Sequence, residues 1–175
     1  MSIKIIQGDI TKLHVDAIVN AANPSLLGGG GVDGAIHRAA GPKLLEECKT
    51  LGGANPGQAK ITHGYNLPAK WVIHTPGPVW QGGNHDEEVI LQHSYENSLC
   101  IARSYELRSI AFPSISTGVY GYPIEKASKV ALSTVNWFLQ ECSYYPMEVI
   151  CVLHNEKDYQ IYIKTAQELR INYEV

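Results

Sequence analysis

No long apolar run occurs in this 175-residue chain, and neither a signal peptide nor a segment able to cross a bilayer is found. Its four cysteines are dispersed, without a C-x-x-C pair, which favours reduced core thiols over disulfides or a zinc site. The net charge of −3 lacks the basic excess that a general nucleic-acid binder needs. No repeat or low-complexity linker appears. These absences make a cytoplasmic protein the expectation.

The composition that remains is that of a folded globular protein, with 45% hydrophobic and 18% charged residues. Its length suits a single domain over residues 1–175. Apolar patterning predicts strands at residues 3–8, 17–20, 60–62, 71–75, 109–113 and 148–153, and helices at 33–49, 86–104, 124–141 and 157–169. Strands that alternate with helices indicate a three-layer α/β/α sandwich around a largely parallel sheet.

Four consecutive glycines, residues 28–31, join one of the predicted strands to a helix, and Asp33 follows in the first helical turn. Glycine is entropically costly, so such a run is expected where side chains would be in the way. A strand, a glycine loop and a helix N-terminus together suit an anion, because unpaired amides face outward and the helix dipole favours negative charge. A tight connector would need only one or two glycines. The loop therefore predicts a phosphate site.

A second loop of small residues, residues 114–123, follows the strand at 109–113. Its Pro123 fits the first turn of the next helix. Ligands of open α/β sheets bind at the carboxyl ends of strands, where such loops gather. Neither loop contains Lys or Arg, so two loops of this kind would clasp a diphosphate with backbone amides alone. On its own, this loop is equally well explained as a plain connector.

The chain resembles the macrodomain family, specifically its MacroD-type hydrolase branch. The matching motifs are Gly8-Asp9-Ile10-Thr11, Asn20-Ala21-Ala22-Asn23, Gly28-Gly29-Gly30-Gly31-Val32-Asp33-Gly34 and Ser116-Thr117-Gly118-Val119-Tyr120-Gly121, with Ile73-His74-Thr75 and Gly77-Pro78-Val79-Trp80 between them. The resemblance implies an α/β/α sandwich around a six-stranded mixed sheet, with ADP-ribose in a cleft at the strand ends. It implies no cofactor.

The same resemblance assigns the two ends of the ligand. Asp9 is expected to accept a hydrogen bond from the adenine amine, with the Ile10 amide beside it; the alternative is a cap for the turn from Thr11 onward. His154 is the expected counterpart of an aromatic residue that stacks on the adenine, or Leu153 if the alignment slips. Asn23 is expected to hold the hydroxyls of the distal ribose, since its amide both donates and accepts.

The remaining binding residues would cradle the diphosphate or support the ribose. The set implied by the resemblance is Asn20, Gly30, Gly31, Val32, Ser116, Thr117, Gly118, Val119 and Tyr120. Tyr120 would also pack beside the distal ribose, or would simply be a partly exposed aromatic residue. Cys48, His63 and His74 have no recognised ligand spacing, so no metal is predicted.

Asp33 separates an enzyme from a binding module in this reading. Members of the catalytic branch carry an aspartate after the glycines, and it is thought to activate water or to orient the substrate; Asn23 is its expected catalytic partner. A helix N-terminus lowers the pKa of a carboxyl whereas desolvation raises it, and the sequence alone leaves that balance open. His37, one turn later, would tune Asp33 or serve as a structural hydrogen-bonding residue.

Three functions stay open at this point. The first is a metal-independent hydrolase that removes ester-linked groups from ADP-ribose, acting on O-acetyl-ADP-ribose and on proteins mono-ADP-ribosylated at Asp or Glu. The second is a non-catalytic ADP-ribose reader, and the third a weak phosphatase on ADP-ribose 1″-phosphate. Because fold alone does not decide function, the choice rests on the site residues. Asp33 together with Asn23 favours the first function over the second. A monomer without nucleic-acid or membrane partners is expected.

Overall fold

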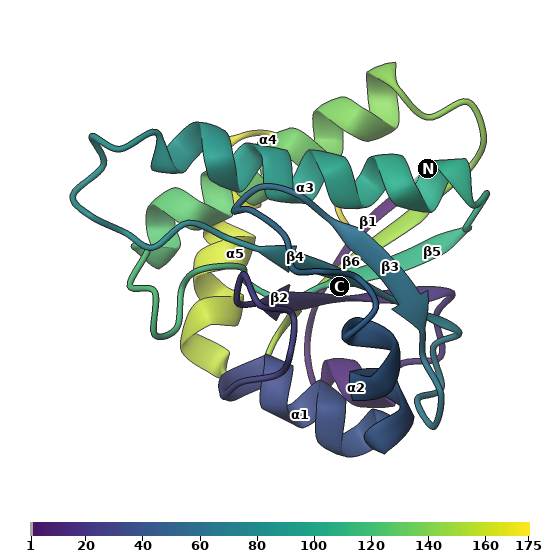
Figure 1. Cartoon of the computed structure of the whole chain (residues 1–175). Helices are drawn as coiled ribbons and strands as arrows, with labels where there is room; N and C mark the ends of the chain where they lie inside the picture. The colour runs from purple at the N-terminus through teal and green to yellow at the C-terminus, as the bar shows by residue number, and fades with distance from the viewer. Residues whose placement is uncertain (1) are drawn as a thin grey trace.

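A computed structural model describes residues 2–175 as a six-stranded sheet between two layers of helices (Figure 1). The strands are β1 Ser2–Gln7, β2 Ala17–Ala22, β3 Lys60–His63, β4 Trp71–Pro76, β5 Ser109–Phe112 and β6 Glu148–Leu153. Their order across the sheet is β1-β6-β5-β2-β4-β3. All neighbours pair in parallel except β3, which runs antiparallel to β4. The predicted sandwich with a mixed, largely parallel sheet is confirmed.

Helices cover both faces of the sheet. They are the 3₁₀ helix η1 Ile10–Lys12 and the α-helices α1 Gly31–Ala40, α2 Pro42–Cys48, α3 Glu87–Ser104, α4 Ile124–Glu141 and α5 Glu156–Glu168. Two hydrophobic cores result: α3, α4 and α5 pack on one face, while α1, α2 and η1 pack on the other. In Figure 1 the first group includes the long helices above the sheet, and α1 and α2 lie below it.

Alternation along the strands feeds both cores at once. In β2, Val19 points into the core under α3 and α4, and its neighbour Ile18 points into the core under α1 and α2. The same alternation separates Ile73 from Val72 in β4. Successive side chains of a strand face opposite sides, so a sheet that is buried on both faces needs strands that are apolar throughout. This is why short apolar runs predicted the strands well.

The single helix predicted at residues 33–49 is wrong, because two helices occupy that stretch. α1 begins at Gly31, and the chain breaks at Gly41, whose φ is +87°, before α2 begins at Pro42. Proline disfavours helical backbone in the preceding residue and lacks the N–H that would continue the ladder. The Gly41 amide instead donates to the carbonyl of His37 and closes α1. Pro123 is likewise the N-cap of α4, not a residue of its first turn.

Both ends of the chain meet at β1. Strand β6 pairs with β1 along its whole length, and Glu174 adds an isolated bridge at Lys4. Glu174 accepts from the Ile5 amide at 2.9 Å and donates to the Ile3 carbonyl at 2.9 Å. Among residues 2–175, no helix has the length and apolar character that a membrane span requires.

Gly77 provides a test of how closely the chain segments pack behind the second small-residue loop. A Cβ on Gly77 would overlap Ser116 Oγ and lie 2.6 Å from Ile115 Cγ2. Gly77→Ala should lower the free energy of unfolding by about 1–3 kcal/mol, as for other overpacking changes. Gly8→Ala is the matched control, because nothing lies within 4 Å of its added Cβ. Urea denaturation of both variants checks this, and equal losses would contradict the close contact.

Candidate functional site

The carboxyl ends of neighbouring parallel strands bring the predicted site residues to one edge of the sheet. Asp9 follows β1, His154 follows β6, the loop at residues 114–123 follows β5, and Asn23 follows β2. These four strands are adjacent in the order β1-β6-β5-β2. Segments that are far apart in the sequence therefore line up in the order that an elongated ligand would require, with Asp9 and His154 at one end and Asn23 at the other.

The glycine loop leads into the exposed start of α1. Gly30 is the N-cap of this helix and offers no side-chain cap, and the first backbone bond of the helix runs from the Gly34 amide to the Gly30 carbonyl. The N–H groups of Gly31, Val32 and Asp33 therefore have no partner within the helix. Gly31 and Val32 are exposed and half-buried, so these two donors are close to solvent. Unpaired donors of this kind, together with the helix dipole, are suited to an anion.

The loop after β5 is held from behind and leaves its own tip open. The Tyr122 amide donates to the Ser116 carbonyl, and the Trp80 amide donates to the Tyr120 carbonyl at 2.8 Å. Ser116 has a φ of +68°, and the side chain of Val119 is fully exposed. Within residues 2–175, the amides of Thr117, Gly118, Val119 and Tyr120 donate to no carbonyl or side chain. The loop thus presents a row of free donors.

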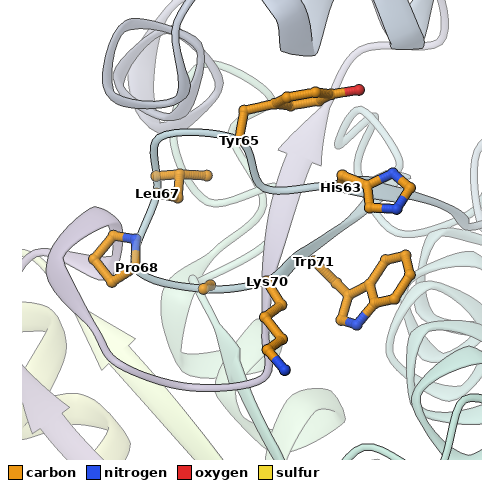
Figure 2. A pocket seen from close by; sticks show the side chains of 7 residues that line it. His63, Tyr65, Leu67, Pro68, Lys70 and Trp71 are labelled. Atoms are coloured by element: carbon orange, nitrogen blue, oxygen red, sulfur yellow. The ribbon is translucent and has the colours of Figure 1, made fainter.

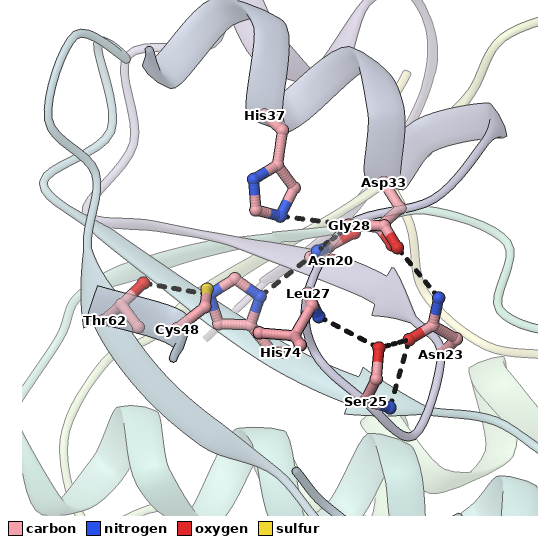
Figure 3. Close-up of polar contacts among 10 residues, drawn as sticks. All are labelled: Asn20, Asn23, Ser25, Leu27, Gly28, Asp33, His37, Cys48, Thr62 and His74. Atoms are coloured by element: carbon pink, nitrogen blue, oxygen red, sulfur yellow. Dashed lines mark hydrogen bonds and ion pairs between the residues drawn. The ribbon is translucent and has the colours of Figure 1, made fainter. Parts of the chain in front are cut away.

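Asp33 is an unusual polar residue at this edge, because it is only 3% exposed. Its Oδ1 accepts from Asn20 Nδ2 at 2.8 Å, and His37 Nε2 lies 3.4 Å away (Figure 3). Its Oδ2 is buried without a partner in the described chain. Burial raises the pKa of Asp33, against the opposing effects of the Asn20 hydrogen bond and of His37. The balance that the sequence left open therefore falls on the side of desolvation.

Gly29 explains how Asp33 and Asn23 can face the same space. A Cβ at this position would lie 3.1 Å from Asp33 Oδ2 and 3.2 Å from Asn23 Nδ2. Asn23 is itself held by its neighbours: Nδ2 donates to the Gly28 carbonyl at 2.9 Å, and Oδ1 accepts from both the amide and the hydroxyl of Ser25. The free carboxylate oxygen and a fixed amide therefore converge above a residue that has no side chain.

Asn20 lies behind Asp33 and is fully buried. Its Nδ2 donates to Asp33 and also approaches His74 Nδ1 at 3.1 Å, while His74 Nε2 lies 2.9 Å from Thr62 Oγ1. Burial lowers the pKa of His74 to about 3, so its imidazole is neutral. Sequence reasoning gave His74 and Thr62 no role in the site. The available signal was an amide and an imidazole within two largely apolar strands, β2 and β4.

At the other end of the edge, the two carboxylate oxygens of Asp9 differ in their hydrogen bonding. Oδ1 accepts from the Thr11 amide at 2.9 Å and from the Thr11 hydroxyl at 2.6 Å, which caps η1 and lowers the pKa of Asp9. All of its hydrogen bonds in the described chain go to Oδ1. The cap considered from the sequence is thus present, and it orients the carboxylate. Ile10 buries its side chain in the core under α1 and α2, and His154 is exposed.

Two hollows lie outside this line of residues. The larger, of about 460 Å³, is formed by the turn between β3 and β4, where His63 stacks on Trp71 (Figure 2). The smaller, of about 350 Å³, lies between residues 24–27 and residues 48–53, next to Asn23. Across residues 2–175, no three His, Cys, Asp or Glu side chains come together in a way that could hold a metal ion.

Comparison with known proteins identifies the family to which this fold belongs. Residues 19–131 match the sequence model of the Macro domain. The chain belongs to the macrodomain family. This macrodomain is 60% identical over 154 residues to a macro domain-containing protein of Methanosarcina mazei. The match covers 88% of this chain and 82% of the relative. The predicted resemblance is confirmed.

Two relatives carry names that state an activity. A Salmonella typhimurium protein named O-acetyl-ADP-ribose deacetylase is 53% identical over 93% of this chain and 92% of its own length. A Xenopus laevis protein named ADP-ribose glycohydrolase is 56% identical over 93% of this chain, which spans 39% of that longer protein.

Solved structures show the same fold at the level of the backbone. An Oceanobacillus iheyensis macrodomain with ADP superposes with a TM-score of 0.90 at 47% identity, covering 94% of this chain and 90% of that one. A Trypanosoma brucei macrodomain in complex with ADP-ribose gives a TM-score of 0.87 at 45% identity, covering 93% and 68% of the two chains.

The burial of Asp33 predicts a pH-dependent stability. Because its pKa in the folded chain lies above the ordinary value of 3.8, protonated Asp33 stabilises the fold, and this contribution is lost as pH rises through the folded pKa. Asp33→Asn should therefore raise the melting temperature at pH 7 by a few degrees, on the order expected for about 1 kcal/mol in a chain of this size.

Thermal melts of both proteins from about pH 4 to pH 8 check this prediction, since the gap must open as the wild-type carboxyl ionises. A gap that stays constant over this range would show that the carboxylate is not penalised by its burial.

Proposed function

We propose that this chain is a single macrodomain over residues 1–175 that binds ADP-ribose along the carboxyl edge of its sheet. Two relatives of known structure were solved with ADP or ADP-ribose. The free amides at the start of α1 and in the loop after β5 support a diphosphate between them. Asp9, Ile10 and His154 would take the adenine end, and Asn23 would hold the distal ribose.

The diphosphate would contact backbone and small side chains on both sides. On the α1 side these residues are Gly30, Gly31 and Val32, and on the β5 side they are Ser116, Thr117, Gly118, Val119 and Tyr120. Tyr120 would also pack beside the distal ribose. No cofactor or metal is proposed, because the amides supply the donors that the phosphate oxygens need.

We further propose hydrolysis of ester-linked groups on the distal ribose, and the buried Asp33 carboxylate carries this proposal. Its unpartnered Oδ2 and the Asn23 amide converge where Gly29 has no side chain. We place the ester of a bound ligand beside these two groups. A carboxylate whose pKa is raised by burial is a better base than an exposed one, and it can accept a proton from an attacking water or hold that water in place.

The reaction is a balanced hydrolysis. Water adds across the ester, the bond between ribose and acyl group is cleaved, and a carboxylic acid leaves while the ribose retains a hydroxyl. The acyl group would be acetate in O-acetyl-ADP-ribose, or the side chain of Asp or Glu in a mono-ADP-ribosylated protein. Two relatives are named for related activities. The chain is proposed to act as a monomer, without nucleic-acid or membrane partners.

Asp33→Ala separates an enzyme from a reader. The variant should bind ADP-ribose within about tenfold of the wild type, because backbone amides carry the diphosphate contacts, and should lose about 10²-fold or more of turnover, the scale expected for a general base. Product release from O-acetyl-ADP-ribose and from Glu-linked ADP-ribosylated protein measures turnover, and calorimetry measures binding. A wild-type protein that binds ADP-ribose and releases nothing from either substrate is a reader.

Gly30 offers a clean test of the phosphate cradle. Its φ of −92° is open to any residue, and nothing lies within 4 Å of an added Cβ, so Gly30→Glu should fold normally. The new carboxylate would repel a phosphate at the start of α1 and should weaken ADP-ribose binding at least tenfold, about 1.4 kcal/mol.

Gly30→Gln is the matched control, because it has the same size without the charge and should bind more tightly than the Glu variant. Calorimetry in low and high salt measures both, since the repulsion is screened by salt. Equal ADP-ribose affinities for the two variants would show that no phosphate binds at the start of α1.

A further inference from the structure

Two neighbouring strands of the sheet carry a buried amide and a buried imidazole where apolar residues would be expected. Asn20 in β2 and His74 in β4 are register partners across the parallel pair, and both are fully buried. A buried amide and a buried imidazole are costly unless their hydrogen bonds are made. Asn20 lies directly behind Asp33 and His74 lies behind Asn20, which suggests a role that packing alone does not supply.

The directions of the hydrogen bonds follow from the chemistry of each group. Asn20 Nδ2 faces the Asp33 carboxylate at 2.8 Å, which can only accept from it while ionised. The second proton of this amide nitrogen points to His74 Nδ1 at 3.1 Å, so that ring nitrogen must be the acceptor. The neutral imidazole therefore carries its proton on Nε2, which donates to Thr62 Oγ1 at 2.9 Å.

Thr62 completes the chain. Its hydroxyl accepts from His74 and donates to the His63 carbonyl at 3.2 Å, so the Oγ1 lone pairs are directed at the imidazole. Cys48 Sγ also lies 3.8 Å from His74 Nε2 and is a weaker acceptor. Figure 3 shows this line of side chains leading from Thr62 through His74 and Asn20 to Asp33.

We propose that Thr62 and His74 are positioning residues for the reaction: Thr62 fixes the His74 tautomer, His74 fixes the orientation of the Asn20 amide, and Asn20 directs the Asp33 carboxylate toward the bound ester. This inference rests on the proposed function for the task of Asp33. It gives Asn20 a part in holding the carboxylate, in place of the contact with substrate expected from the sequence.

The opposite tautomer shows why the acceptor on Thr62 matters. A proton on His74 Nδ1 would face the Asn20 amide nitrogen, and relief would require the amide to turn over and present Oδ1. That oxygen would then also face Asp33 Oδ1, and two oxygens in contact disfavour the ionised carboxyl. Loss of the Thr62 hydroxyl therefore raises the pKa of Asp33, although Thr62 belongs to the edge strand β3 and does not touch Asp33.

Several ionisable groups near Asp33 must be considered when a pH effect is assigned to its carboxyl. His37 faces it from its own helix α1, His74 lies behind Asn20 on β4, and Cys48 approaches from α2. Glu47, also on α2, influences both Cys48 and His74. Thr62 variants leave all of these groups in place, so a shift of the Asp33 titration in such a variant reports the hydrogen-bonded chain.

The test is a pair of variants at Thr62 and a readout that does not need turnover. Thr62→Val removes the hydroxyl at nearly constant shape, and Thr62→Ser keeps it. The ¹³Cγ resonance of Asp33, assigned by its loss in Asp33→Asn, gives the carboxyl pKa directly. Thr62→Val should raise that pKa by about 0.5–1 unit, as for loss of one hydrogen bond to a carboxylate, and Thr62→Ser should leave it within about 0.2 unit.

Kinetics on O-acetyl-ADP-ribose provide the second readout. Thr62→Val should reduce kcat about 3–10-fold with the acid limb of the kcat profile moved to higher pH, while KM and ADP-ribose affinity stay within about twofold. An unshifted Asp33 titration in Thr62→Val would overturn the proposal. A wild-type protein without turnover would instead remove the proposed function, and the titration would still decide whether the chain of hydrogen bonds holds the carboxylate.

His74 supplies an independent pair if Thr62→Val fails to fold. In His74→Asn the side-chain oxygen can take the place of Nδ1 as acceptor, whereas His74→Leu has none. The Asp33 pKa should rise more in His74→Leu than in His74→Asn. Equal titrations in the two variants would show that His74 merely fills space.

Discussion

Desolvation of the Asp33 carboxylate is the constraint that governs the polar contacts at the centre of the candidate site. A buried carboxylate is unfavourable in water-free surroundings, and here it receives one hydrogen bond from Asn20, the neighbouring imidazole of His37 and a place in the first turn of α1. These contacts do not offset the burial completely, since the pKa of Asp33 remains raised. A group kept in such a state is typical of sites where chemistry, and not stability, has set the residue type.

The rest of the proposed ligand recognition at the sheet edge would come from the backbone. Both loops rely on unpaired amides, and an amide donor carries no net charge that would need a partner when the ligand is absent. A protein with a net charge of −3 can therefore present a site for a doubly charged ligand. Gly29 and Gly77 allow close packing at this edge, since neither places a side chain where two segments approach each other.

The sequence predicted the fold well where one local property decides the structure. Strands buried on both faces are largely apolar, so β2, β4, β5 and β6 were located to within a residue or two. The break between α1 and α2 was missed, although Gly41 and Pro42 mark it. The glycine loop and the loop after β5 stood out because their composition is unusual, and their meeting at one edge follows from parallel pairing.

The support behind Asp33 could not be predicted in the same way. Asn20 and His74 are 54 residues apart, and their contact depends on which strands are neighbours and on the register between them. Periodicity reveals which face a residue takes but not which strand lies beside it. The orientation of the Asp9 carboxylate, with one oxygen bound to Thr11, likewise depends on the rotamer that the folded chain selects.

The pairing of β1 with β6 also has a consequence for how the molecule is made. One wall of the sheet edge is built from residues just after β1, and that strand is flanked by β6 and by Glu174, which the ribosome delivers more than 140 residues later. Until those segments emerge, the Asp9 end of the edge has no neighbour, and β1 is an unpaired strand among newly synthesised chains. The proposed adenine end of the site is therefore completed only at the close of synthesis, when the last segments of the chain have been added beside β1.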